Sequence, residues 1–165
     1  MRRAYDLCLY GLAWIGGVSI LAMFAIVVVD VSIRTLGGRP PGWSVPVTEY
    51  LLVYFAMFAA PYVLRLRGHV FVEMMVDRLP EAGKAWFGRL VALICSLAAG
   101  LLTVYSAILM IEAIESGELD LRAIDIPIWL LYLPLPIGFA FLAAEFAIFA
   151  LGRDGLYAAN VDAPH

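Results

Sequence analysis

The sequence predicts an all-α membrane protein with four transmembrane helices, on the evidence of apolar length and composition. Four stretches contain no charged side chain: residues 7–29, 50–64, 90–111 and 126–144, of 23, 15, 22 and 19 residues. A helix rises about 1.5 Å per residue, so about 20 apolar residues cross a hydrocarbon layer of ~30 Å. The composition agrees, with 64% hydrophobic and 15% charged residues, against roughly 25% charged in soluble domains.

Residues 1–165 are expected to form one integral membrane domain, because no segment outside these stretches is long enough to build a core of its own. Lipid offers the backbone no hydrogen bonds, so each stretch forms a helix. With flanking residues, we expect spans near 7–33, 44–65, 86–111 and 126–150, and a tail at 151–165. The net charge of −3 disfavours a nucleic-acid partner.

The distribution of positive charge predicts the orientation. Eight Lys and Arg residues lie in the two tails and the second connection, against three in the first and third connections. The positive-inside rule therefore places both termini and the second connection in the cytoplasm. Trp43 and Trp129 are then expected in the outer aromatic belt and Trp86 in the inner one.

The first span is expected to remain uncleaved, since its apolar run exceeds the roughly 7–15 residues of a signal-peptide core. If its helix continues past Val29, Asp30 and Arg34 form an i, i+4 pair. If the second helix starts near Trp43, Glu49 lies inside it at the outer membrane level. We hypothesise that Asp30, Arg34 and Glu49 form one structural charge cluster that clamps the first hairpin. The alternatives are contact with a partner protein and an ion or substrate site.

The second connection is expected to hold a short amphipathic helix along the cytoplasmic interface. His69, Glu73 and Asp77 share one stripe, apolar side chains occupy the opposite stripe, and Pro80 ends the segment. Arg67 and His69 are interpreted as interface anchors. Residues at i and i+8 of one helix are too far apart to share an ion, so no metal site is predicted here.

The third span has small residues four apart, which permit close helix packing. They are Ala92, Ser96 and Gly100 on one line and Ala99, Thr103 and Ala107 on another. Packing inside this bundle is the favoured interpretation, and packing against another membrane protein is the alternative.

Three prolines mark the fourth span. Pro127 is expected to start the helix, whereas Pro134 and Pro136 lie inside it and each removes a backbone donor. A kink that shapes the helix is the favoured interpretation. The alternative is the broken helix of a transporter site, but no charged side chain lies in this run.

No cofactor, metal site or catalytic set is predicted. The histidines, His69 and His165, lie outside the spans, where they offer no axial ligand to a heme within the membrane. Cys8 and Cys95 lie within spans and are expected to pack as small hydrophobic residues. We find no ionisable group near the midplane to handle cargo. The chain is therefore interpreted as an accessory subunit, with a membrane anchor for a redox or enzyme complex and a stand-alone small carrier as alternatives.

Four short motifs follow one another along the chain. They are Asp30-Val31-x-x-Arg34, then Trp43 and Glu49, then Arg65-Leu66-Arg67-Gly68-His69-Val70-x-Val72, then Ile126-Pro127-x-Trp129 with Pro136 and Gly138. Over about residues 5–150 the chain resembles the small transmembrane subunit (DctQ type) of tripartite ATP-independent periplasmic (TRAP) transporters.

The resemblance implies a three-part importer in the bacterial inner membrane. A periplasmic binding protein would capture an organic acid, a large membrane subunit would carry it inward with sodium, and the small subunit would hold the large one in place. The small subunit would have no catalytic residues. Elements expected to help dock the binding protein are Arg39 in the first connection and Glu115, Glu118 and Asp120 in the third.

Overall fold

The structure, a computed structural model, describes residues 2–66, 81–120 and 125–151. The predicted interfacial helix, with Arg67 and His69, and the tail lie outside these residues. The described elements are α1 (Arg2–Thr35), α2 (Ser44–Arg65), α4 (Glu81–Ser116), β1 (Leu119–Asp120), β2 (Ile126–Pro127), α5 (Trp129–Tyr132) and α6 (Pro134–Leu151).

Among the described residues, four helical segments are long and apolar enough to cross a membrane, which confirms the predicted fold class. They are Tyr5–Thr35, Ser44–Arg65, Trp86–Ser116 and Trp129–Leu151, the last formed by α5 and α6 together. α1 has 34 residues and α4 has 36, so each is about 50 Å long at ~1.5 Å per residue. Both are longer than predicted and exceed the ~30 Å hydrocarbon layer, so they tilt or extend beyond it.

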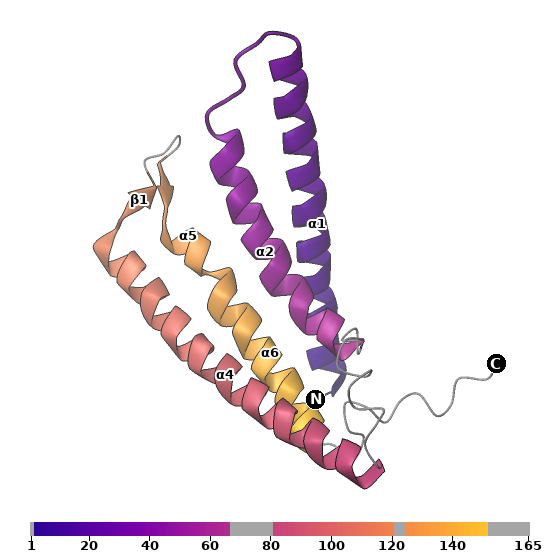
Figure 1. Cartoon of the computed structure of the whole chain (residues 1–165). Coiled ribbons are helices and arrows are strands. Elements are labelled where there is room, and N and C mark those ends of the chain that lie inside the picture. Colours follow the sequence, from indigo (N-terminus) through magenta and orange to yellow (C-terminus); the bar gives the residue numbers. More distant parts are fainter. Residues whose placement is uncertain (1, 67–80, 121–124, 152–165) are drawn as a thin grey trace, which may run out of the picture.

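The helices form a layer in the order α1, α2, α6, α4 (Figure 1). The chain makes two hairpins, and α2 packs against α6 to join them. The start of α1 and the end of α6 lie at one end of the molecule, and the α1–α2 connection and the two strands lie at the other. An even number of spans brings the start of α1 and the end of α6 to the same end. The prediction that this end faces the cytoplasm rests on the charge distribution.

Glycines end α1 and α4. Gly37 has φ of 78° and Gly117 has φ of 61°, values that L side chains rarely adopt. After α1, the Gly38 N–H donates to the Ile33 carbonyl at 2.9 Å, the long bond of a Schellman cap. The two long helices therefore end where these glycines reverse the chain.

The third connection contains a short antiparallel pairing of β1 with β2. Leu119 lies opposite Pro127 and Asp120 opposite Ile126. The prediction that Pro127 starts the fourth helix is wrong, because Pro127 belongs to β2 and the helix begins at Trp129. A residue before proline favours extended backbone, so Ile126 suits a strand better than a helix start.

Prolines free two backbone carbonyls where α2 packs beside α5 and α6, one on α5 and one on α2. Pro134 has no N–H to bond the Leu130 carbonyl, four residues earlier, and the Tyr54 hydroxyl donates to that carbonyl at 2.8 Å. Pro61 likewise leaves the Met57 carbonyl free, and Gly138 lies directly against it. Each freed carbonyl is thus covered from the neighbouring helix.

α5 ends at Tyr132 and α6 begins at Pro134, and Leu133 between them has helical dihedrals (φ −53°, ψ −44°). The predicted kink near Pro134 stays a prediction. Three of the small residues of α4 pack inside the chain: Ala92 and Ala99 are buried, and the Ser96 hydroxyl donates to the Ala143 carbonyl of α6 at 3.0 Å. This favours packing within the chain as the role of the small-residue lines.

Candidate functional site

The outer end, defined as the end that holds the α1–α2 connection and the strands, has a polar cluster centred on Asp30. Arg34 Nε donates to Asp30 Oδ2 at 2.7 Å, one helical turn along α1. The Ser44 hydroxyl, at the start of α2, donates to Asp30 Oδ1 at 2.5 Å. The Asp30 side chain is 14% exposed and that of Arg34 is 58% exposed. Asp30 therefore joins α1 to α2 through Ser44, which was not predicted as a site residue.

Glu49 lies on α2 five residues after Ser44 and is exposed. Its membership of the Asp30 cluster stays a prediction. Trp43 immediately precedes α2 and lines a cavity of about 180 Å³ with Asp30, Ser44 and apolar residues of α1.

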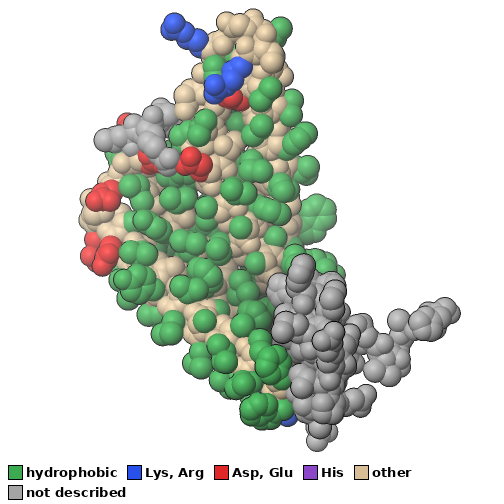
Figure 2. All heavy atoms as spheres, viewed as in Figure 1, with side chains coloured by type: hydrophobic (Ala, Val, Ile, Leu, Met, Phe, Trp, Pro, Cys, Tyr) green, Lys and Arg blue, Asp and Glu red, His purple; other side chains and the backbone are tan. Residues whose placement is uncertain are grey.

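The four residues predicted to dock the binding protein lie in two places. Arg39 is exposed on the α1–α2 connection, and Glu115 and Glu118 are exposed at the end of α4. Asp120 is half-buried and accepts a hydrogen bond of 3.3 Å from the hydroxyl of Tyr50 on α2. Figure 2 shows basic side chains at the tip of the first hairpin and acidic ones over the end of α4. The outer end thus presents two regions of opposite charge.

A second polar cluster, at the opposite end, was not predicted. The Glu145 side chain on α6 is 3% exposed, and its Oε1 lies 3.7 Å from Arg65 Nη1 at the end of α2. Arg65 Nη2 also lies 2.6 Å from Oδ1 of Asp6, on α1. One guanidinium therefore joins three helices.

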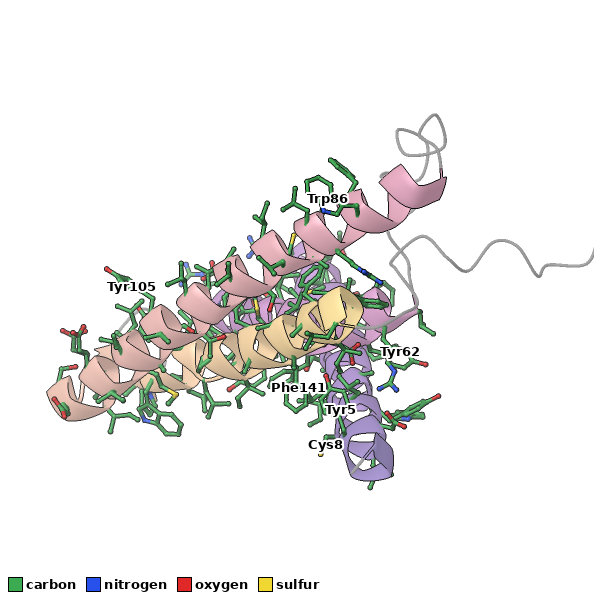
Figure 3. All side chains as sticks on the ribbon, turned by 90° about the horizontal axis from the view of Figure 1, so that it is seen from below. Tyr5, Cys8, Tyr62, Trp86, Tyr105 and Phe141 are labelled. Atoms are coloured by element: carbon green, nitrogen blue, oxygen red, sulfur yellow. The ribbon has the colours of Figure 1, made fainter. Side chains whose placement is uncertain are left out.

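Aromatic side chains cover this second cluster. The Tyr5 ring stacks on Phe141 at 5.8 Å between centroids, and the Arg65 guanidinium lies 5.8 Å from the centre of the Tyr5 ring. Viewed from below, Tyr5 and Phe141 lie together (Figure 3). Arg65 is thus held by two carboxylates and an aromatic face.

Glu145 lies inside the predicted fourth span but was not singled out there, and the prediction that no ionisable group lies near the midplane is not tested by it. The fourth apolar run was ended at Ala144, yet six more residues of α6 follow Glu145, so this carboxyl lies about 9 Å inside the helix end at ~1.5 Å per residue. The signal was present in the sequence: Glu145 interrupts an apolar segment, and a lone acid within a span is usually paired. Asp6 and Arg65 stand directly beside the first and second runs.

The predicted aromatic anchors Trp86 and Trp129 differ in how exposed they are. Trp86 is exposed near the start of α4, and Figure 3 shows Trp86 and Tyr105 on the side of α4 that faces away from α6. Trp129 is half-buried at the start of α5. Within the described part of the chain, no group of three or more His, Cys, Asp or Glu side chains is placed to hold a metal ion.

Comparison with known proteins decides the family. The family model described as the DctQ component of tripartite ATP-independent periplasmic transporters matches residues 23–154. The chain belongs to this family. It is accordingly a component of a tripartite ATP-independent transporter and an integral protein of the inner membrane, in a family of transporters rather than enzymes.

Two curated relatives agree with this family. The chain is 25% identical over 131 residues to the C4-dicarboxylate TRAP transporter small permease protein DctQ of Rhodobacter capsulatus, covering 79% of this chain and 56% of that protein. It is 27% identical over 85 residues to the sialic acid TRAP transporter permease protein SiaT of Haemophilus influenzae (strain 86-028NP), covering 50% of this chain and 14% of that protein. The chain thus spans about half of one relative and a small part of the other. No solved structure matches.

Proposed function

We propose that this chain is the small membrane subunit of a sodium-coupled importer of organic acids, and that it scaffolds the large transport subunit. The observation that carries the proposal is the family match over residues 23–154. One relative is named for C4-dicarboxylates and the other for sialic acid. Both solutes are carboxylic acids, so we infer a carboxylate substrate for this system. Sodium coupling follows from the resemblance to the family.

The packing of the helices supports a scaffold. Glu145, the deeply buried acid, lies beside Arg65, and the proline-freed carbonyl of Leu130 is bonded by Tyr54 of the neighbouring helix. These contacts join α2 to α5 and α6, and the ion pair of Arg65 with Asp6 adds α1. A carrier domain that moves through the membrane needs such a fixed frame to move against.

The outer end supports a role in docking the periplasmic binding protein. Arg39 and the acidic residues Glu115 and Glu118 are exposed in separate regions, so a partner with complementary charges would be oriented as well as attracted. We propose Trp43 as an apolar contact beside Arg39, since its side chain is 41% exposed. This assignment depends on the orientation predicted from the positive-inside rule.

Purification and uptake test the subunit role. The chain should co-purify with the co-expressed large subunit, and sodium-dependent uptake of a carboxylate into vesicles should require both subunits and the binding protein. Uptake by this chain alone would instead establish the stand-alone carrier. A soluble enzyme that co-purifies with it, or a heme spectrum, would support the membrane anchor.

Crosslinking tests the docking role separately. A photoreactive residue at position 39 or 118 should trap the binding protein during uptake. One at Tyr105, on the side of α4 that faces away from α6, should not. Crosslinks from neither connection would remove the docking role while leaving the scaffold role intact.

A further inference from the structure

A cavity of about 300 Å³ lies between α1 and α2, beside Arg65. It is lined by Asp6, Leu9, Tyr10, Tyr62, Arg65 and Leu66. Its volume is at the lower end of the range of small-molecule sites, about 300–1,000 Å³. Neither transport nor docking, as proposed above, uses it.

The charges beside this cavity do not balance. Arg65 lies within 4 Å of the carboxylates of both Asp6 and Glu145, so the three side chains have two formal negative charges and one positive. Oε1 of Glu145 is buried 3.7 Å from Arg65 Nη1, so Glu145, which does not itself line the cavity, draws on the same guanidinium as Asp6. An excess carboxylate at low dielectric is unfavourable unless a cation approaches. The site therefore favours a ligand that brings positive charge.

Two tyrosines complete the cavity on its apolar side. The rings of Tyr10 and Tyr62 lie 5.3 Å apart between centroids, tilted by 55°. Aromatic rings attract ammonium groups through their quadrupoles, and Leu9 and Leu66 add apolar surface. A carboxylate, a guanidinium and two aromatic rings thus surround one space.

The depth of the cavity indicates where its ligand comes from. Asp6 is the second residue of the first span and Arg65 is the last residue of the second. Both therefore lie where the helices leave the hydrocarbon layer, at the level of lipid headgroups. The side chains of Asp6 and Arg65 are each 39% exposed, so both are accessible to a ligand.

We propose that this cavity binds the phosphoethanolamine headgroup of an aminophospholipid. The ammonium group donates to Asp6 beside the tyrosine rings, and the phosphate accepts from the exposed part of Arg65. Phosphatidylglycerol brings a negative charge without a cation, and phosphatidylcholine has no N–H to donate. A basic side chain of a partner protein would satisfy Asp6 alone, whereas the zwitterion satisfies Asp6 and Arg65 together.

Native mass spectrometry of the full chain in mild detergent tests the site. The chain is exchanged against equimolar phosphatidylethanolamine, phosphatidylcholine and phosphatidylglycerol with identical acyl chains. We expect phosphatidylethanolamine to be retained about tenfold over phosphatidylglycerol, the effect of one charge-assisted hydrogen bond. Asp6→Asn should abolish this preference. Asp30→Asn, which changes the other cluster, should leave the preference unchanged.

Other outcomes would overturn the proposal. Retention of phosphatidylglycerol at least equal to that of phosphatidylethanolamine would do so, as would binding of free phosphoethanolamine without binding of the lipid. If Asp6→Asn does not fold, amide hydrogen exchange of the unaltered chain decides. The first turns of α1 should be more protected in nanodiscs of phosphatidylethanolamine than of phosphatidylglycerol, and equal protection would contradict the proposal. No uptake is measured, so the result is independent of the proposed function.

Discussion

Glu145 is a buried acid that depends on a neighbouring cation. Its side chain lies inside α6, 3.7 Å from the guanidinium of Arg65. A charge held in this way is costly to leave alone, so removing the cation matters more than removing the whole pair. Because the Arg65 side chain is itself 39% exposed, water screens its attraction to Glu145. The loss of stability on removing Arg65 is therefore smaller than for a fully buried pair.

Arg65→Gln should therefore destabilise the chain, by about 1–3 kcal/mol. Adding Glu145→Gln to this variant should restore part of the loss, because the unpaired carboxylate is removed as well. The measurement is the thermal unfolding midpoint of the full chain in detergent. Arg39→Gln, at an exposed arginine of the first connection, is the matched control and should change little. A double variant less stable than Arg65→Gln would show that the pairing is not what holds Glu145.

Ser44 gives a second test at this scale, at the outer end. Ser44→Ala removes the donor to Asp30 Oδ1 and should cost about 1–2 kcal/mol, since a bond to a charged group is lost. Ser32→Ala is the control, because that exposed serine bonds only to the Val28 carbonyl of its own helix. Thermal unfolding of both variants gives the comparison. Equal losses would mean that Ser44 does not tie α1 to α2.

The sequence was informative about these clusters to different degrees. Asp30 and Arg34 were predictable because i, i+4 spacing fixes their proximity on one helix. Their bond to Ser44 depends on how the α1–α2 connection turns. The contacts of Arg65 with Asp6 and with Glu145 join three helices, and no local spacing encodes them.

At the scale of helices, the contact of α2 with α6 depends on prolines that free carbonyls and on neighbours that cover them. Pro134 frees the Leu130 carbonyl for the Tyr54 hydroxyl. In a membrane, where water cannot replace the lost hydrogen bond, a neighbouring helix must supply the donor. The carbonyl that Pro134 frees is therefore bonded from α2, whereas the predicted kink of the helix stays a prediction.

Gly138→Ala tests this contact. A Cβ at position 138 would lie 2.7 Å from the Met57 carbonyl oxygen, a backbone atom, so α2 and α6 would have to separate. We expect a loss of about 1–3 kcal/mol in thermal unfolding. Gly100→Ala is the control, since no atom lies within 4 Å of its added Cβ and alanine favours a helix by up to about 1 kcal/mol. Equal stability of the two variants would contradict close packing at Gly138.

The existence of the helices was predictable and their ends were less so. Apolar length alone identified four spans, because a span must satisfy its own backbone in lipid. α1 and α4 extend past the apolar runs until Gly37 and Gly117 reverse the chain, and polar residues beyond the hydrocarbon layer do not stop a helix. The pairing of β1 with β2 was missed because each strand has only two residues, too few to show an alternating pattern.

At the scale of the molecule, the order α1, α2, α6, α4 leaves α1 and α4, the helices at the two edges of the layer, with broad apolar faces. Leu7, Trp14 and Leu21 on α1 and Leu97, Leu101 and Val104 on α4 are all exposed. In a membrane such faces meet lipid or another membrane protein, and apolar character alone does not distinguish the two. The layer therefore has room for a large partner alongside it, as a scaffold subunit requires.

The orientation of this layer gives the last prediction, in a Cys8→Ala, Cys95→Ala background. Single cysteines at the exposed Leu36 and at Glu118 should both react with a membrane-impermeant maleimide in cells with a permeabilised outer membrane. The structure places both connections at one end, and the positive-inside rule places that end outside. A cysteine at Asp6, at the opposite end, should react only after the inner membrane is opened.

The experiment tests two premises separately: that both connections lie at one end, and that this end faces outside. If both connections react only in opened membranes, the common end is retained but the charge rule is wrong, and the docking role of Arg39 and Glu118 is lost with it. If one connection reacts and the other does not, the spans do not pair as two hairpins in the membrane. Labelling thus separates the fold, which fixes which residues share an end, from the charge distribution, which decides the side that end faces.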